Sequence, residues 1–196
     1  MQRWILVIVT CLVSPLAFGT GLSDIGIRGG VGLMGWNLGA TYRVNDFVSV
    51  GAGLNRFSYS YNGGLKGVNY NADLKLSSEM LFVNIYPFAG GFHLTGGWVH
   101  NGNALTLSGQ PDQNGNYTFN GQTYSGSQVG TVNAGLGFGS SATYLGIGWG
   151  GNGDWGMTLD IGAMNQGTPK FSLNASAAAS NPQLQNDVNQ QQAQTQ

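Results

Sequence analysis

Apolar residues alternate with small or polar residues along much of this chain, and the small or polar side carries few charges. A period of two places successive side chains on opposite faces of a β-strand. In a water-soluble sheet protein, the face opposite the core usually carries Lys, Glu and Arg. Residues 47–55 contain no charged residue. The clearest alternation is Val48, Val50, Ala52 and Leu54 against Ser49, Gly51, Gly53 and Asn55.

The composition of the chain shows the same shortage of charge. Only 8% of the 196 residues are charged, against about a quarter in ordinary globular proteins, whereas the hydrophobic content of 41% is ordinary. Glycine contributes 34 residues. The 7 basic and 8 acidic residues leave no positive patch for phosphates, so nucleic acid is not expected as a partner.

Residues 1–19 have the three parts of a secretory signal peptide. A short positive start, Met1-Gln2-Arg3, precedes an apolar run, and Ala17-Phe18-Gly19 forms a small-x-small cleavage pattern. We expect cleavage after Gly19. A transmembrane anchor is the alternative, but Pro15 and the small residues shorten the run below the ~20 apolar residues that a span needs. Because Cys11 is the only cysteine, a mature chain without it would have no disulfide and no cysteine-based site.

Seven segments after residue 19 have the period of β-strands, with a bulge or register change expected near Glu79. The connections between them alternate in length, with short turns at 45–46, 87–91 and 150–154 and long polar stretches at 61–71, at 107–130 and after 165. Such alternation is typical of outer-membrane barrels. We therefore predict an all-β, antiparallel up-and-down transmembrane β-barrel over residues 20–175. The segments are 25–31, 36–45, 48–55, 73–82, 92–101, 144–149 and 155–163.

A bacterial barrel of one chain has an even number of strands, so eight are expected and the last is missing from this pattern. Residues 176–196 form a polar, Gln-rich loop or tail with weak helical character, because Leu184 and Val188 are one turn apart. Such a tail cannot be a membrane strand. The sequence leaves three explanations: truncation before a closing strand, which we favour, a poor closing strand at 171–175, or pairing with another copy.

Eight strands enclose an interior that side chains just fill, so inward-facing charges are expected to pair there. We predict an interior polar network of Arg28, Arg43, Asp73, Lys75, Glu79, His93 and Asp160. Aromatic residues near strand ends predict girdles at the two membrane interfaces. The predicted girdle residues are Trp36, Tyr42, Tyr86, Phe88, Trp98, Trp149 and Trp155.

Signals of catalysis and metal binding are weak in this sequence. His93 and His100 are seven residues apart, which places them on opposite faces of a strand and argues against a shared metal site. No G-x-S-x-G elbow is present, and the glycine-rich segments lack the lysine of a phosphate-binding loop. We expect neither an enzyme nor a bound cofactor.

Two stretches carry a resemblance to a known group, NIYPFAGGFHLTGG at 84–97 and YLGIGWGGNGDWGMTLDIGAMNQGTPKFSL at 144–173. They resemble small, poorly characterised outer-membrane β-barrel proteins of Gram-negative bacteria, over about residues 24–190. The resemblance implies an eight-stranded barrel with a tyrosine-proline-phenylalanine turn and a glycine-rich hairpin around a tryptophan. Members usually end in a strand closing with Tyr-Arg-Phe or similar, which this sequence lacks. No catalytic residues come with it.

The expected function is that of a non-enzymatic outer-membrane barrel with a filled interior, a structural or contact role, and recognition through residues 107–130. A small channel for hydrophobic or small polar solutes is the main alternative. A lipid-acting enzyme would need His100, and a soluble secreted β-sandwich would need charged outer faces. The expected partners are the lipid bilayer, lipopolysaccharide and the barrel assembly machinery after export through the periplasm, with no extracellular ligand indicated.

Overall fold

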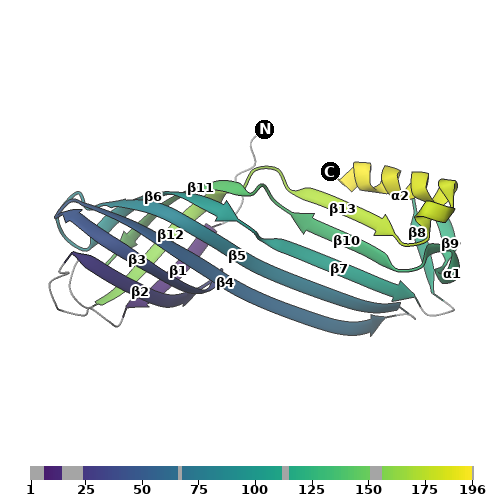
Figure 1. Cartoon of the computed structure of the whole chain (residues 1–196), viewed down its shortest axis with the longest axis horizontal. Coiled ribbons are helices and arrows are strands. Elements are labelled where there is room, and N and C mark those ends of the chain that lie inside the picture. The colour runs from purple at the N-terminus through teal and green to yellow at the C-terminus, as the bar shows by residue number, and fades with distance from the viewer. Residues whose placement is uncertain (1–6, 15–23, 66–67, 112–114, 151–155, 196) are drawn as a thin grey trace. The chain divides into compact units, whose positions relative to one another are not determined.

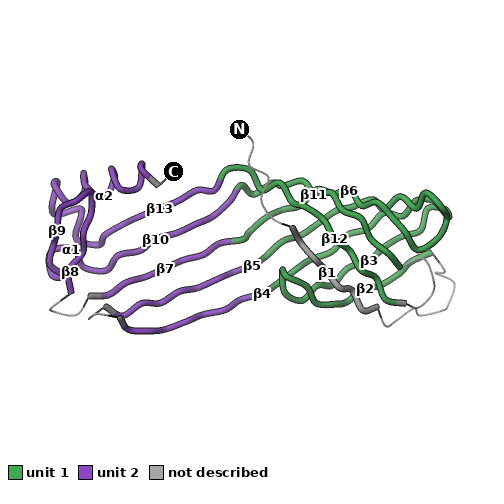
Figure 2. The backbone as a smooth tube through the Cα atoms, turned by 180° about the vertical axis from the view of Figure 1, so that it is seen from behind, with its two compact units in different colours: residues 1–57, 76–103, 139–168 green, residues 58–75, 104–138, 169–196 purple. Residues whose placement is uncertain are grey.

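The computed structural model describes residues 7–14, 24–65, 68–111, 115–150 and 156–195 (Figure 1). They form two compact units, which Figure 2 colours separately. Unit 1 comprises residues 1–57, 76–103 and 139–168, and unit 2 comprises residues 58–75, 104–138 and 169–196. Antiparallel strands dominate the described chain, which confirms the all-β antiparallel fold class.

Unit 1 is built on a closed ring of eight strands. Their order is β5, β4, β3, β2, β1, β12, β11 and β6, and a further pairing of β5 with β6 closes the ring. Two of these strands, β4 and β5, are long and also contribute to unit 2. The strands are β1 (Val7–Ser14), β2 (Ile25–Gly32), β3 (Gly35–Asn45), β4 (Val48–Leu65), β5 (Val68–Ile85), β6 (Phe92–Asn101), β11 (Ser141–Trp149) and β12 (Gly156–Asn165).

The seven strands predicted after residue 19 are all present, as β2 to β6, β11 and β12. The remaining place in the ring is occupied by β1, which lies within the predicted signal peptide. Its backbone pairs with β12 from Val7–Ala163 to Ser14–Gly156, and with β2 from Thr10 to Val13. If residues 1–19 are removed, β2 and β12 therefore become the two edges of a seven-stranded sheet.

Local chemistry explains two of the turns. Between β3 and β4 the Asn45 side chain accepts a 2.8 Å hydrogen bond from the Phe47 N–H, an Asx turn at the predicted position. Between β2 and β3, Gly35 has a φ of 91°, and a Cβ there would lie 2.3 Å from the Arg56 carbonyl oxygen. Only glycine fits this close approach without strain.

The middle of β5 differs from the sequence-based expectation. Val68–Lys75 pairs with β7, and Ser78–Ile85 pairs with β6 in one unbroken register. The strand thus changes partner just before Glu79, where a bulge or register change was expected. Its pairing with β6 brings the chain back into the ring of unit 1.

Unit 2 contains a sheet of five strands lying side by side (Figure 2). The last part of β4 and the first part of β5 belong to this sheet and lie at one side of it. The long stretches predicted as polar loops are therefore largely regular structure. The further elements are β7 (Ala104–Pro111), β8 (Asn116–Phe119), β9 (Gln122–Ser125), α1 (Gly126–Val129), β10 (Val132–Gly137), β13 (Lys170–Ala175), η1 (Ala178–Ser180) and α2 (Pro182–Thr195).

The Gln-rich tail forms α2, and this helix completes the core of unit 2. Asn181 caps its first turn by accepting a 3.2 Å hydrogen bond from the Leu184 N–H, and Pro182 occupies the first position, where proline is well tolerated. Leu184 and Val188 are fully buried against Phe119 and Tyr124 of the β8–β9 hairpin. No helix among the described residues is long and apolar enough to cross a membrane.

Candidate functional site: the barrel interior and its outer belt

The outer face of unit 1 is covered by exposed apolar side chains. Their exposed fractions run from 36% at Ile161 to 71% at Met157. Large apolar patches on a monomer mark contact with another protein or with a membrane. The belt residues include Ile25, Ile27, Val31, Leu38, Val50, Leu81, Val83, Ile85, Leu94, Leu145, Ile147, Met157, Leu159 and Ile161.

The belt ends at a row of polar side chains. Strand pairing places Trp36 opposite Arg56, Glu79 opposite His100, and His100 opposite Ser141. An ion pair of 2.8 Å between Arg56 Nη2 and Glu79 Oε1 joins β4 to β5 on this row. Two residues away on the same outward faces, Leu81 of β5 and Trp98 of β6 belong to the apolar belt. The outer face therefore changes abruptly from apolar to polar.

Five of the predicted girdle aromatics are exposed on unit 1, and a sixth is not. Trp36, Tyr42, Phe88, Trp98 and Trp149 are each at least 47% exposed. Phe88, Phe92 and Trp149 form a connected aromatic group, with ring centroids 6.1 and 5.2 Å apart. Tyr86 is buried instead, because its ring packs against His93. Trp155 lies outside the described residues.

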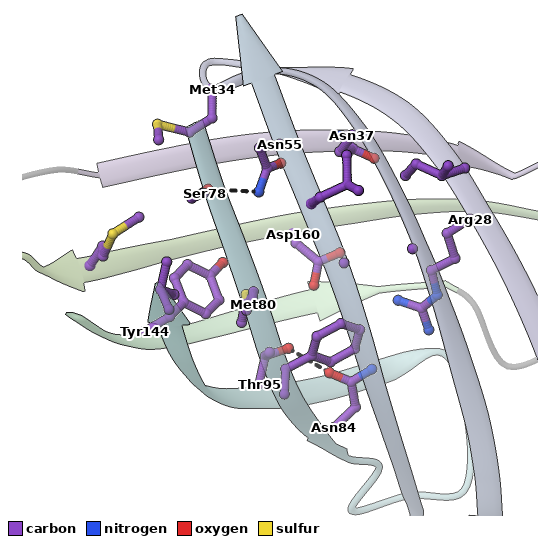
Figure 3. A pocket seen from close by; sticks show the side chains of 17 residues that line it. Arg28, Met34, Asn37, Asn55, Ser78, Met80, Asn84, Thr95, Tyr144 and Asp160 are labelled. Atoms are coloured by element: carbon purple, nitrogen blue, oxygen red, sulfur yellow. Dashed lines mark hydrogen bonds between the residues drawn. The ribbon is translucent and has the colours of Figure 1, made fainter. Parts of the chain in front are cut away.

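Inward-facing side chains of unit 1 surround a cavity of about 110 Å³ (Figure 3). Its walls mix charged and amide groups, such as Arg28, Asn37 and Asp160, with apolar ones. A space of this size holds a few waters or one small molecule. The apolar part of the wall includes Met34, Met80, Phe82, Val99 and Met164.

His93 and Asp160, both predicted interior residues, are brought together from β6 and β12. His93 Nε2 lies 2.8 Å from Asp160 Oδ1, and the imidazole is fully buried. Its Nδ1 lies 3.2 Å from the Gly91 carbonyl oxygen. A Cβ at Gly148 would lie 2.4 Å from His93 Nε2. The glycine in β11 thus makes room for this pair.

Arg28 is also inside, with 8% of its surface exposed and its guanidinium carbon 6.0 Å from the centre of the Phe82 ring. Two other polar atoms at the cavity wall, Asn37 Nδ2 and Asp160 Oδ2, are buried and have no hydrogen-bond partner among the described residues. Buried polar atoms without a partner are costly. A small polar guest in the cavity would satisfy them.

A ladder of uncharged polar side chains links the inner faces of β4, β5 and β6. Thr95 Oγ1 donates to Asn84 Oδ1 at 2.9 Å, and Asn84 Nδ2 donates to Ser49 Oγ at 3.3 Å. Asn55 Nδ2 donates to Ser78 Oγ at 3.1 Å (Figure 3). The sequence-based network, restricted to charged residues, missed these groups. The inward parity of Ser49, Asn55 and Thr95 was an available signal for part of the ladder. Ser78 and Asn84 of β5 share the parity of Phe82, which the pattern placed outside.

A second polar cluster joins Asn101 and Asn103 to Gln166 of the segment after β12. The Asn101 and Asn103 Nδ2 atoms lie 2.9 and 3.3 Å from Gln166 Oε1. Asn103 Oδ1 also accepts a 2.9 Å bond from the Ser77 N–H. All three side chains are buried, and the sequence analysis did not select them.

The structure places three of the predicted network residues elsewhere. Glu79 is on the outer face, 60% exposed in its ion pair with Arg56. Asp73 and Lys75 are exposed and belong to unit 2, where Asp73 Oδ1 accepts a 2.5 Å hydrogen bond from Ser60 Oγ. Placing Glu79 inside implies, by the alternation of the strand, that Met80 and Phe82 face outward, but these two residues line the cavity. Arg43 is half-buried on β3.

The described ranges contain no cluster of three or more His, Cys, Asp or Glu side chains that could hold a metal ion. His100, the other histidine, is exposed with its ring 6.3 Å from that of Trp98. The two histidines thus lie on opposite faces of β6.

No protein-family model matches the chain, and no curated protein matches it. Two crystal structures from Acinetobacter baumannii align with it. CarO2 aligns at 19% identity and a TM-score of 0.49, over 95% of this chain and 90% of that protein. CarO aligns at 19% identity and a TM-score of 0.48, over 94% and 91%. At this identity, no side-chain role is carried over from either protein.

Proposed function

We propose that unit 1 spans a bacterial outer membrane as a β-barrel whose interior is too filled to form an open pore. The protein then has a structural or contact role in the envelope rather than a catalytic one. The observation that carries this proposal is the apolar outer belt with its polar border. An apolar surface facing outward around a closed ring is what hydrocarbon requires, because a closed ring leaves no unpaired backbone.

The height of the belt supports a membrane span. Along β6 the belt runs from Phe92 to the polar row at His100, a rise of eight residues. At ~3.4 Å per residue and a strand tilt of about 40°, this corresponds to about 21 Å across the membrane. Outer-membrane barrels have an apolar band of about 25 Å. The Phe88–Phe92–Trp149 group and Trp36 with Trp98 supply aromatic residues near its two ends.

The contents of the ring support a filled interior. The side chains of Met34, Tyr86, His93, Tyr144 and Met164 are all less than 10% exposed, whereas side chains that line an open lumen would be exposed to solvent. The His93–Asp160 pair further links β6 to β12 across β11. A cavity of about 110 Å³ remains, which is small compared with the aqueous lumen of large porins.

Planar-bilayer recordings test the filled interior. The purified chain should fold into detergent, shift its gel migration on boiling, and show no steady conductance after reconstitution. A variant with Phe82→Ala and Tyr144→Ala, which removes two aromatic rings that line the cavity, should conduct. Steady conductance by the unaltered chain would contradict the filled interior. Failure to insert into vesicles would contradict the membrane span.

A small channel is the second candidate, and one observation favours it. Asn37 Nδ2 and Asp160 Oδ2 line the cavity without partners among the described residues, as expected of a place where a polar solute or water binds. Swelling of vesicles in small polar solutes tests this role. Swelling that Asn37→Leu abolishes would favour the channel, and swelling rates equal to those of empty vesicles would exclude it.

No catalytic role is included in the proposal. Both ring nitrogens of His93 have partners within the fold, and His100 lies on the exposed outer face. The remaining candidate, lipid hydrolysis through His100, is tested with lipid vesicles as substrate. The unaltered chain should release no fatty acid, and release that His100→Ala removes would overturn the non-enzymatic role.

A further inference from the structure

The cavity of unit 1 contains a buried cation that the fold does not pair. Arg28 is 8% exposed, and its guanidinium carbon lies 6.0 Å from the centre of the Phe82 ring. Within the described part of the chain, no carboxylate lies within ion-pair distance of this guanidinium and no acceptor is hydrogen-bonded to it. Buried charges are costly unless they are paired and hydrogen-bonded. The N–H groups of Arg28 are therefore available to an anion in the cavity.

Asn37 of β3 and Asp160 of β12 each present one hydrogen-bonding atom to the same cavity. The Asn37 Nδ2 donor and the Asp160 Oδ2 acceptor are both buried, and neither has a hydrogen-bond partner among the residues that the structure describes. In the view of Figure 3, the Asp160 carboxylate lies between Asn37 and Arg28. The other carboxylate oxygen, Asp160 Oδ1, lies 2.8 Å from His93 Nε2. The cavity thus offers two donor groups and one acceptor.

These groups select a guest that carries both a carboxylate and a hydroxyl. A carboxylate matches the planar fork of a guanidinium, because it can accept two parallel hydrogen bonds from Arg28. Its charge also pairs the buried cation, and Asn37 Nδ2 can donate to it. Asp160 Oδ2 requires a donor instead. Since Asp160 Oδ1 already contacts His93, a neutral hydroxyl satisfies Oδ2 without bringing a further charge out of water.

The rest of the cavity wall limits the size of this guest. A volume of about 110 Å³ is that of roughly three or four waters, each of which takes about 30 Å³ in the liquid. The guest must therefore have a short carbon skeleton. Met34, Met80 and Val99 supply apolar wall against which such a skeleton can pack. A few polar groups set in an apolar wall are typical of small-molecule sites.

We propose that unit 1 binds one small hydroxy acid in this cavity. Its carboxylate accepts hydrogen bonds from Arg28 and Asn37, and its hydroxyl donates to Asp160 Oδ2. The inference rests on the filled interior of the proposed function, because an open pore would place all three groups in water. It adds a ligand that the barrel holds, which a structural or contact role does not require.

Saturation-transfer NMR on the folded full chain, in deuterated detergent micelles at pH 7, tests the choice of ligand. Four probes share one three-carbon skeleton. Lactate carries the carboxylate and the hydroxyl, propionate lacks the hydroxyl, alanine has an ammonium in its place, and lactamide lacks the carboxylate charge. Lactate should bind saturably and more tightly than the other three. Absence of saturable lactate binding overturns the site, and tighter binding of any other probe overturns the hydroxy acid.

A pair of matched variants tests the role of Arg28. Arg28→Gln removes the buried charge and should weaken lactate binding by about tenfold or more, as expected for the loss of charge-assisted hydrogen bonds. Arg56→Gln makes the same change in the exposed ion pair of the outer face and should leave lactate binding unaltered. Asn37→Leu removes one donor without changing the charge and should also weaken binding. Lactate affinities equal to that of the unaltered chain in folded Arg28→Gln or folded Asn37→Leu overturn the proposed contacts.

The partner of the hydroxyl is tested separately. Combining His93→Leu with Asp160→Leu removes the buried contact as a whole, so that neither side chain is left enclosed without its partner. Lactate and propionate should then bind equally well, because the acceptor for the hydroxyl is gone. A preference for lactate that persists in this variant overturns the contact with Asp160.

Bilayer recordings on the same preparation separate this inference from the proposed function. Steady conductance by the unaltered chain contradicts the filled interior and the site that rests on it. A chain that inserts without conductance and does not bind lactate overturns the site alone. A chain that inserts without conductance and binds lactate through Arg28 supports both.

Discussion

The two ends of β5 show opposite patterns along one continuous strand. In unit 1, Leu81, Val83 and Ile85 are exposed on one face while Asn84 is buried on the other. In unit 2, the face that continues the first carries exposed Asp73 and Lys75. The half-buried Ala72 and Leu74 lie on the face that continues from Asn84. The exposed face is apolar at one end and charged at the other.

The reversal at Glu79 shows that the surroundings of a strand decide which of its two faces is apolar. On the proposed function, the exposed face of residues 81–85 meets lipid, where apolar side chains cost nothing. The exposed face of residues 73–79 meets water, where charges are solvated and apolar groups turn toward a core. The same alternation therefore has two opposite meanings within one strand.

Among the changes that test this comparison, removal of residues 1–19 is expected to have the largest effect on the stability of unit 1. The chain 20–196 lacks β1, so β2 and β12 lose their neighbour, and each unpaired backbone group in hydrocarbon costs several kcal/mol. We expect this chain to lose the shift in gel migration on boiling that is expected of the full chain folded in detergent. A shift equal to that of the full chain would show that β2 and β12 close the barrel by themselves.

Breaking the buried contact between His93 and Asp160 in unit 1 should have the next largest effect. His93→Leu leaves the Asp160 carboxylate enclosed without its partner, which costs about 3–5 kcal/mol of unfolding free energy. Glu79→Gln breaks the exposed pair with Arg56 and should cost less than about 1 kcal/mol. Urea unfolding in vesicles measures both. Combining His93→Leu with Asp160→Leu should recover most of the loss, and equal losses in the two single variants would contradict the enclosed site.

Placing an arginine on each end of β5 tests the reversal directly. Val83→Arg introduces a charge into the outer belt, which costs about 2–4 kcal/mol near the middle of a bilayer. Asn71→Arg makes the corresponding change on the exposed face in unit 2 and should alter stability by less than about 0.5 kcal/mol. The comparison fails if both variants insert into vesicles and unfold like the unaltered chain.

The smallest effect concerns the docking of α2 in unit 2. The Tyr124 hydroxyl donates a 2.5 Å hydrogen bond to Asp187 Oδ2, and this bond, with burial and the nearby carboxylate charge, raises the pKa of Tyr124 above its ordinary value. The bond therefore stabilises the folded state fully below about pH 10 and is lost as the pH rises through the raised pKa.

Limited proteolysis of α2 as a function of pH measures this contribution. Cleavage should accelerate above pH 10 in the unaltered chain. Tyr124→Phe should cleave faster at neutral pH and show a weaker acceleration above pH 10. A Tyr124→Phe profile identical to that of the unaltered chain would show that this hydrogen bond does not stabilise the docking of α2.

The sequence by itself determined the class of fold and most of the barrel strands. Alternation over residues 36–55, with an apolar face and a small or polar one, is a local property that survives in any arrangement of neighbours. The same holds for the Asx turn at Asn45 and for the helical spacing of Leu184 and Val188. Inward positions such as His93 and Asp160 followed from parity in strands with one clear apolar face.

Only the tertiary structure decided which residues meet and where each face of β5 points. His93 and Asp160 are 67 residues apart, and their contact depends on the order β6, β11, β12 in the ring. Parity gives two faces but does not say which one is inside. In β5, hydrophobic residues occur on both faces, so pattern alone placed Glu79 inside and Phe82 outside. Unit 2 was missed because its strands contain many polar residues, and its core is completed by α2 and the β8–β9 hairpin, which are distant from β4 and β5 in the sequence.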